Sequence, residues 1–219
     1  DPYTDPENSK LTCYTITNTH VPAVVSINVL KVWEDENNQD GIQPADVKVQ
    51  LYKVVDGDVE GTTEEVEVGT AVALSAGNQW KHTFTSTDEL PLYRYEKGVE
   101  IDYEVKEVEV PAGYTANVVE TEAEANSNKT YSYTVTNTHT PELTKVELIK
   151  VWDDNKNQDG KRAKVVFELY ADNAATGKTA TLEGDDLLKD SWTVTFDNLE
   201  VYKAGEVGKK IVYTVVETE

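Results

Sequence analysis

The alternation of apolar and polar residues predicts β-strands along most of the chain. From Val25 to Trp33, apolar side chains occupy every second position and therefore share one face of a strand. Lys31 falls on that apolar face as well. A lysine among apolar side chains is costly unless it is neutral or hydrogen-bonded. The same pattern recurs around Lys150, between Val146 and Trp152, so the inward lysine is a repeated feature of the sequence and not an accident.

Two further strands place a polar residue in line with an apolar face. In the stretch from Ile101 to Glu107 the apolar face ends at Glu107, and in the stretch from Tyr131 to Asn137 it ends at Asn137. A single polar residue at the point where a strand leaves the core is an ordinary structural feature. One lysine, one glutamate and one asparagine at the ends of three strands form a more specific set. We expect Lys31, Glu107 and Asn137 to approach one another.

An internal repeat defines the layout of the chain. The interval from Lys31 to Lys150 equals the interval from Asn18 to Asn137. The matching segments are Ile27–Gly41 with Val146–Gly160, Tyr14–His20 with Tyr133–His139, and Ile101–Glu107 with Ile211–Glu217. The chain is therefore predicted to consist of tandem copies of one structural unit.

The repeat predicts three segments. Residues 23–140 contain every signature of a unit, residues 141–219 lack only the last strand, and residues 1–22 contain that last strand alone. Short runs rich in Val, Thr and Tyr, separated by Asn, Asp and Gly, favour all-β sandwiches. On this basis the chain starts inside one unit and stops inside another, as an interior piece of a longer protein would.

Composition and charge exclude several function classes. The 219 residues carry a net charge of −21, and no basic patch offsets it, so binding to nucleic acid or to an anionic membrane is not expected. No apolar run reaches transmembrane length, and no signal segment opens the chain. Cys13 is the one cysteine, so an internal disulfide is impossible, and we expect its thiol to face outward.

Other candidate sites have weak support. The polar stretches Glu34–Gly41 and Asp153–Gly160 are similar to calcium loops, but neither is followed by the glutamate that ends such a loop in helix–loop–helix proteins. We interpret both as polar turns. The histidines His20, His82 and His139 are scattered and have no metal-ligand spacing. No metal or other cofactor is expected.

Lys31, Glu107 and Asn137 have a reaction available if the fold brings them together. Burial disfavours the charged forms of both the amine and the carboxyl. A neutral amine is a nucleophile, and a protonated carboxylic acid polarises the side-chain amide of Asn137. Attack on that amide would form a Lys–Asn isopeptide bond and release ammonia, at the high effective concentration that a fold provides. The alternative is a buried Lys–Glu ion pair, hydrogen-bonded to the asparagine, with no bond formed.

These motifs together resemble the B-type repeats of Gram-positive collagen-binding adhesins, the CnaB-type domains. The similar motifs are KVWDDNKNQDG, LY, YxVxE and TNT, and they cover nearly the whole chain. The resemblance implies tandem two-sheet, reverse immunoglobulin-like (CnaB/prealbumin-like) sandwiches. It also implies spontaneous isopeptide bonds, with Lys31 as nucleophile, Asn137 as acceptor and Glu107 as the assisting acid. Lys150 and Glu217 match the nucleophile and the acid of the second unit, but no matching asparagine follows them.

Asn18 is the spare acceptor. The entry and exit of a tandem unit are expected at opposite poles, and the whole unit 23–140 separates Asn18 from the second unit of its own chain. We therefore predict head-to-tail assembly, in which Asn18 of one copy docks beside Lys150 and Glu217 of the next copy and is then linked covalently.

The predicted function is structural. The resemblance implies a stalk repeat of an extracellular, cell-wall-anchored surface protein. The chain is not expected to be an enzyme, because its chemistry is a single self-linking turnover. A ligand-binding module for collagen or a glycan is the alternative, and host extracellular matrix would be contacted through the full-length adhesin. An enzyme, the third class, would need a pocket with convergent titratable groups away from the lysine, glutamate and asparagine.

Overall fold

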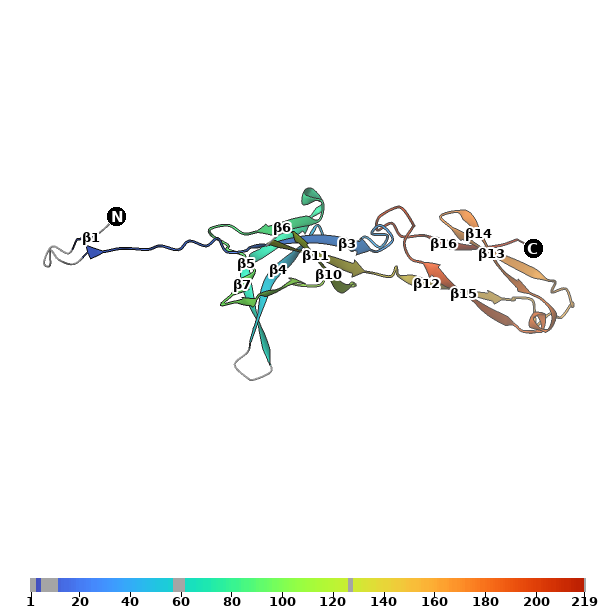
Figure 1. Ribbon diagram of the computed structural model, residues 1–219. Helices are drawn as coiled ribbons and strands as arrows, with labels where there is room; N and C mark the ends of the chain where they lie inside the picture. The colour runs from blue at the N-terminus through green and yellow to red at the C-terminus, as the bar shows by residue number, and fades with distance from the viewer. Residues whose placement is uncertain (1–2, 5–11, 57–61, 126–127, 219) are drawn as a thin grey trace.

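The computed structural model describes residues 3–4, 12–56, 62–125 and 128–218. Two β-rich units lie end to end, and a thin N-terminal segment extends from the pole of the first unit that lies away from the second (Figure 1). The segment contains the short pair β1 (Tyr3–Thr4) and β2 (Thr12–Cys13). The side chain of Cys13 lies outside the described residues, and so does the prediction that its thiol faces outward.

The first unit is built from nine strands among the described residues. They are β3 (Val25–Glu34), β4 (Asp46–Asp56), β5 (Thr63–Ser75), β6 (Lys81–Thr85), β7 (Tyr95–Glu96), β8 (Val99–Glu100), β9 (Asp102–Glu107), β10 (Thr115–Ala125) and β11 (Asn128–Thr138). A short 3₁₀ helix, η1 (Ala76–Asn78), connects β5 to β6.

Two sheets of this unit enclose its core. One sheet has the order β10-β11-β3-β6, and the other has the order β5-β4-β9. β3 and β11, which are distant in sequence, pair in parallel with Val135 opposite Lys31. The core between the sheets includes Ile27, Leu51 and Tyr131, each at most 2 % exposed. The alternation of β3 is confirmed, since Val25, Ile27, Val29 and Lys31 are all buried.

The second unit repeats this plan with fewer strands. They are β12 (Leu143–Val151), β13 (Val165–Ala171), β14 (Ala174–Leu182), β15 (Ser191–Glu200) and β16 (Tyr213–Glu217), with a 3₁₀ helix, η2 (Gly184–Leu188), before β15. The sheets have the orders β12-β15 and β14-β13-β16. Leu169 and Leu182 are fully buried between them.

One edge of β12 distinguishes the second unit from the first. β12 pairs with β15 in the way that β3 pairs with β6, but within the described residues no strand occupies the place that β11 has beside β3. Ile149 and Val151, near the end of β12, are 58 % and 64 % exposed. The second unit therefore presents an unpaired strand edge with apolar side chains.

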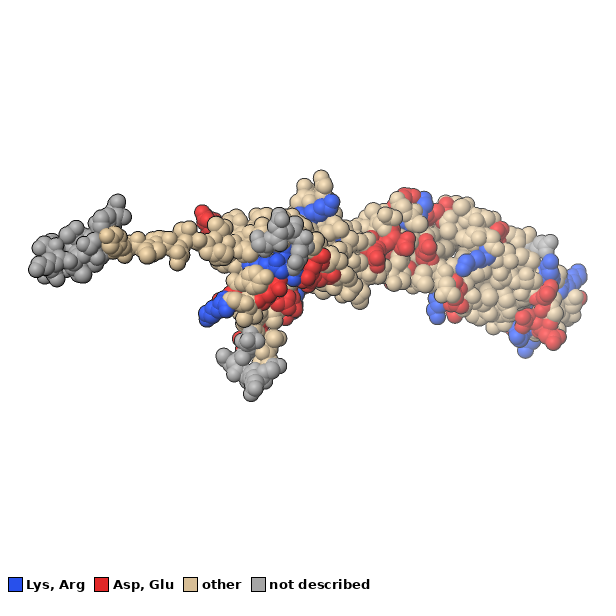
Figure 2. Space-filling model, in the orientation of Figure 1, with Lys and Arg blue, Asp and Glu red and all other residues tan. Residues whose placement is uncertain are grey.

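The prediction of an all-β chain of sandwich units is confirmed, and the helices of the described residues are the two short 3₁₀ segments. No helix in the described ranges has the length and apolarity needed to cross a membrane. On the face drawn in Figure 2, acidic side chains gather around the contact between the two units, and basic side chains are interspersed.

Candidate functional site

Lys31 ends the buried row of β3. Its side chain reaches into the core of the first unit, and the residue is 3 % exposed. Nζ donates hydrogen bonds to the carbonyl oxygens of Val32 at 3.0 Å and Val135 at 3.4 Å. It also lies 4.0 Å from the ring centroid of Trp33, in cation–π geometry. These contacts hold the amine in place without pairing it directly with a carboxylate.

Glu107 and Asn137 reach the same region from the two facing sheets. Glu107 is the last residue of β9, and Asn137 lies near the end of β11. Asn137 Nδ2 donates a hydrogen bond to Glu107 Oε1 at 3.0 Å, and Asn137 is completely buried. Because Val135 stands opposite Lys31, Asn137 projects from the same face two residues further along. The structure thus gathers Lys31, Glu107 and Asn137 at the end of the core nearest the second unit.

Burial shifts both titratable groups towards their neutral forms. Desolvation lowers the pKa of Lys31 from its ordinary value to about 8, although the charges of Glu107 and Asp35 oppose the shift. Desolvation raises the pKa of Glu107, against the hydrogen bond from Asn137 and the charge of Lys31. The amine and the acid are therefore moved towards the protonation states that nucleophilic attack and acid assistance require.

Two acceptor atoms at this site lack hydrogen bonds. Asn137 Oδ1 and Glu107 Oε2 are buried and have no partner among the described residues. An unpaired buried polar atom costs about 1–3 kcal/mol. A half-turn of the Asn137 amide about its Cβ–Cγ bond would present Oδ1 to Glu107, and a protonated Glu107 could then donate to it. The geometry accommodates the hydrogen bond that would polarise the amide carbonyl.

The corresponding pair of the second unit is more exposed. Lys150 Nζ lies 3.0 Å from Glu217 Oε2, and the side chain of Glu217 is 48 % exposed. Lys150 also stacks over the ring of Trp152 at 4.6 Å, as Lys31 does over Trp33. The difference in exposure has a simple cause, because no described strand covers the edge of β12 at this point.

Asn18 lies far from both lysines. Residues 14–22 form an extended, exposed segment outside any strand, at the opposite end of the molecule from Lys150 and Glu217 (Figure 1). Tyr14 and Ile16 of this segment are 77 % and 86 % exposed. The segment therefore carries the sequence of a last strand without a strand partner among the described residues.

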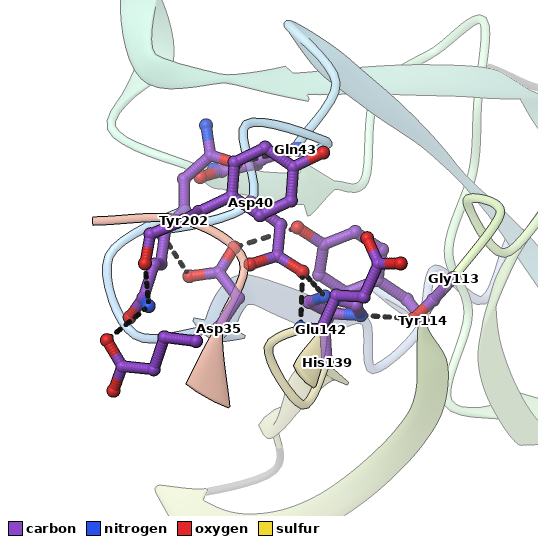
Figure 3. Close-up of polar contacts among 11 residues, drawn as sticks. Asp35, Asp40, Gln43, Gly113, Tyr114, His139, Glu142 and Tyr202 are labelled. Carbon is purple, nitrogen blue, oxygen red and sulfur yellow. Dashed lines mark hydrogen bonds and ion pairs between the residues drawn. The ribbon is translucent and has the colours of Figure 1, made fainter. Parts of the chain in front are cut away.

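A second cluster of polar contacts lies where the two units meet (Figure 3). Asp40 Oδ2 accepts a hydrogen bond from the backbone nitrogen of Glu142 at 2.8 Å and lies 2.9 Å from His139 Nε2. The other ring nitrogen of His139, Nδ1, lies 2.7 Å from the carbonyl oxygen of Gly113. Because both nitrogens face acceptors, the protonated imidazolium satisfies the site best. The hydrogen bond with Asp40 accordingly raises the pKa of His139.

The turn that carries Asp40 also contacts the second unit. We call Asp35–Gly41 the first joint turn. Gln39 Nε2 donates to the carbonyl oxygen of Tyr202 at 2.9 Å and to Glu200 Oε2 at 3.3 Å. The carbonyl oxygen of Gln39 accepts from the backbone nitrogen of Gly208 at 2.9 Å. These bonds connect the two units directly, in addition to the covalent linker.

The strand pattern and the motifs do not predict this contact between the units. The polar turns are present, but the first of them is a contact surface as well as a turn. His139 has no metal-ligand spacing, but both the polar turn and the TNTH motif that contains this histidine recur in the internal repeat. The recurrence of the two motifs together is the sequence feature that could have predicted a contact between neighbouring units. No group of three or more His, Cys, Asp or Glu side chains in the described part of the chain is arranged to hold a metal ion.

Comparisons with known proteins agree on one family. The sequence profile of the Cna protein B-type domain matches residues 27–138 and 146–219. A collagen adhesin of Staphylococcus aureus is 40 % identical over 203 residues, which make up 93 % of this chain and 15 % of that protein. The chain thus spans about one seventh of the length of this curated relative.

Solved structures show the same similarity. A crystal structure of two B repeat units of the collagen binding protein of Staphylococcus aureus superposes with a TM-score of 0.61 at 33 % identity. That match covers 99 % of this chain and 55 % of the other chain. A single B repeat unit of the same protein is 34 % identical over 89 % of this chain and 85 % of its own, with a TM-score of 0.35.

Proposed function

Because this chain belongs to the Cna protein B-type domain family, we propose that it forms part of the stalk of a cell-wall-anchored bacterial surface adhesin. The end-to-end arrangement of its units supports this role, since such units lengthen a protein without adding width (Figure 1). The similarity to a collagen adhesin and to a collagen binding surface protein supports a location outside the cell. The single observation that carries the proposal is the convergence of a buried lysine, a buried asparagine and a half-buried glutamate in the first unit.

The stalk unit would be stabilised by a Lys31–Asn137 isopeptide bond. In the proposed reaction, the neutral Nζ of Lys31 attacks Cγ of Asn137, and a C–N bond forms. The bond from Cγ to Nδ2 then breaks, and Nδ2 leaves as ammonia after it has gained a proton. Glu107 is the assisting acid, because its carboxyl contacts the amide and burial raises its pKa. The proton that Lys31 loses restores the carboxyl, so each unit reacts once and needs no cofactor.

Intact mass spectrometry of the purified chain tests the bond. We expect the first unit to be lighter than its sequence by one molecule of ammonia, with Lys31 and Asn137 joined in one branched peptide after proteolysis. Glu107→Ala should restore the full mass, because the acid is lost while both reacting groups remain. Glu109→Ala, which removes an exposed carboxyl two residues away, is the matched control and should leave the linkage intact. Full mass in the unaltered chain would contradict the proposal.

We further propose that copies of this chain join head to tail through strand complementation. The unpaired edge of β12 supports this, because in the first unit the corresponding edge of β3 carries β11 in a parallel pairing. The exposed segment around Asn18 (YTITNTH) nearly repeats the end of β11 (YTVTNTH). In the same register, Asn18 of one copy would lie beside Lys150 and Glu217 of another, as Asn137 lies near Lys31. A covalent bond of the same kind would then link the copies.

Denaturing gel electrophoresis of concentrated protein tests this assembly. We expect a ladder of covalent oligomers in the unaltered chain. The ladder should be lost in Asn18→Ala and Lys150→Ala, whereas the exposed control Asn117→Ala should retain it. Monomer alone on the gel, together with unmodified Lys150 by mass spectrometry, would exclude the covalent form.

Ligand binding is a separate question. The S. aureus relatives are a collagen adhesin and a collagen binding protein, and this chain corresponds to 15 % of the adhesin. We propose that any contact with host matrix is made by the full-length protein, with this segment as a spacer. A binding assay of the isolated chain on immobilised collagen should then give no saturable signal.

A further inference from the structure

The second unit carries its own copy of the first joint turn. We call Asp154–Gly160 the second joint turn. Three successive residues adopt left-handed backbone conformations in each turn, with φ between 51° and 62°. In each, the third of these residues donates its backbone nitrogen to the aspartate that opens the turn, at 2.9 Å in the first turn and 3.0 Å in the second. The two turns therefore have the same internally supported conformation.

The turns differ in what covers them. Gln39 and Asp40 of the first joint turn are buried against the second unit, whereas their counterparts Gln158 and Asp159 are exposed. A Cβ atom placed on Gly41 would lie 2.8 Å from Gly208 Cα, but one placed on Gly160 would meet nothing within 4 Å. The second joint turn is thus a contact surface that nothing in the described chain covers.

The acidic groups of the second joint turn are not equivalent. Asp154 is held by the guanidinium of Arg162, with Nε and Nη2 each 2.7 Å from one of its oxygens. In the first joint turn, the hydroxyl of Tyr114 donates to the corresponding Asp35 at 2.8 Å. Asp159, by contrast, makes no hydrogen bond or ion pair within the described residues. Its counterpart Asp40 is the residue that binds the linker in the observed joint.

The first unit has counterparts of the groups that the first joint turn binds. His20 and Ala23 correspond in the repeat to His139 and Glu142. Tyr95 corresponds to Tyr202, because each pairs across the following loop, with Glu100 and Lys210 respectively. His20 and Tyr95 are exposed at the free pole of the first unit.

We propose that the second joint turn is the docking surface for the first unit of a second copy of this chain. Asp159 would receive the ring of His20 and the backbone nitrogen of Ala23, and Gln158 would donate to the carbonyl oxygen of Tyr95. The observed joint supplies the template for each contact. The inference deepens the proposed head-to-tail assembly, on which it rests. It adds that the copies meet at a defined angle, like that between the two units of one chain.

Sedimentation velocity on the full chain tests the docking separately from the covalent bond. All variants carry Lys150→Ala, which prevents the linkage and leaves association reversible. We expect Asp159→Ala and His20→Ala each to weaken association by about tenfold or more, because each removes a hydrogen bond to a charged group. Asp197→Ala removes an exposed aspartate near the opposite pole of the second unit and should leave association unchanged.

The possible results distinguish docking at the second joint turn from strand complementation with a covalent bond. Equal association of the Asp159→Ala and Asp197→Ala variants would overturn the docking surface and leave strand complementation standing. Association that depends on Asp159, without any covalent product in the unaltered chain, would remove the isopeptide link between copies and keep the docking surface. A chain that stays monomeric in every form would overturn both.

Discussion

At the scale of single residues, burial controls the chemistry of the first unit. Lys31 is buried and Glu107 is half-buried at the same end of the core, where desolvation lowers the pKa of the amine to about 8 and raises the pKa of the acid. The reactive combination is a neutral amine together with a protonated acid. This combination has the same number of protons as the ammonium–carboxylate pair, and the two forms differ only in which group holds one proton. The population of this reactive form depends on the pKa values of both groups and therefore on pH.

The pH dependence of bond formation follows from these two shifts. Between the pKa values of the two groups the population of the reactive form is level; it falls at lower pH as the amine gains a proton and at higher pH as the acid loses one. We expect a level rate over this interval and a fall of about tenfold per pH unit on either side. The measurement is the rate of ammonia loss, followed by mass, when chain recovered unfolded from inclusion bodies is refolded at a series of pH values. A rate that keeps rising well above pH 8 would contradict an assisting role for protonated Glu107.

At the scale of elements, the two joint turns take their conformation from their own sequences and not from a neighbouring unit. The left-handed residues of each turn and the aspartate that opens it produce the same conformation with a neighbouring unit or without one. A preformed turn loses little conformational entropy when it docks. The close approach of Gly41 to Gly208 then fixes the distance between the units.

Gly41→Ala and Gly160→Ala form a matched pair that tests this contact. Both residues have positive φ, +72° and +61°, so both substitutions introduce similar backbone strain of about 1 kcal/mol. The alanine at position 41 would also clash with Gly208 and break the hydrogen bond from Gly208 to Gln39. We expect small-angle scattering of dilute monomer to show a wider range of inter-unit angles for Gly41→Ala than for Gly160→Ala. Identical scattering curves would show that the contact does not hold the joint.

At the scale of the whole molecule, the proposed isopeptide bond and the joint would act along one axis. Force that enters β3 would reach Lys31, cross the isopeptide bond to Asn137 and leave through the linker to the second unit. The residues between positions 31 and 137 would carry no load. In the chain-entropy model, closing a loop of this length stabilises the fold by roughly 4–5 kcal/mol, by analogy with a disulfide. A stalk built in this way extends little under tension.

Force spectroscopy should detect this difference. We expect the unaltered first unit to release no length from the segment between Lys31 and Asn137, whereas the Glu107→Ala variant unfolds and releases it. Glu109→Ala should behave like the unaltered chain. Equal release of length in all three would show that the cross-link carries no load.

The His139 contact makes the joint sensitive to pH. Asp40, Asp35, Glu34, Tyr114 and Glu142 are the titratable residues around this histidine. The folded-state pKa of His139 is raised, so its stabilising contribution is complete below the ordinary histidine value and is lost as pH rises through the raised value. NMR titration should show His139 charging at higher pH than an ordinary histidine, and Asp40→Asn should remove the difference. His82, whose pKa burial lowers, is an internal control that should titrate below the ordinary value.

The sequence alone determined the fold class, the repeated units and the direction of the key side chains. The period-two alternation predicted which face of β3 is buried, because side chains in any strand alternate between faces. The repeat and the composition predicted tandem all-β units, since similar sequences form similar local structure. The polar residues in line with apolar faces predicted that Lys31, Glu107 and Asn137 would point into a core; Lys31 and Asn137 are buried there, and Glu107 is half-buried beside Asn137.

Only the tertiary structure decided how these parts meet. The parallel pairing of β3 with β11 and the contact of Glu107 with Asn137 depend on sheet order, which strand patterns do not contain. The hydrogen bonds from His139 to Asp40 and from Gln39 to Tyr202 join residues that are 99 and 163 positions apart in sequence, at an angle set by packing. Lys31 and Lys150 both lie in the sequence KVW, yet one is buried and the other partly exposed, because among the described residues only β3 has a second neighbouring strand, β11, on its other edge. A periodic pattern specifies which way a side chain points, and the assembled fold specifies what it meets there.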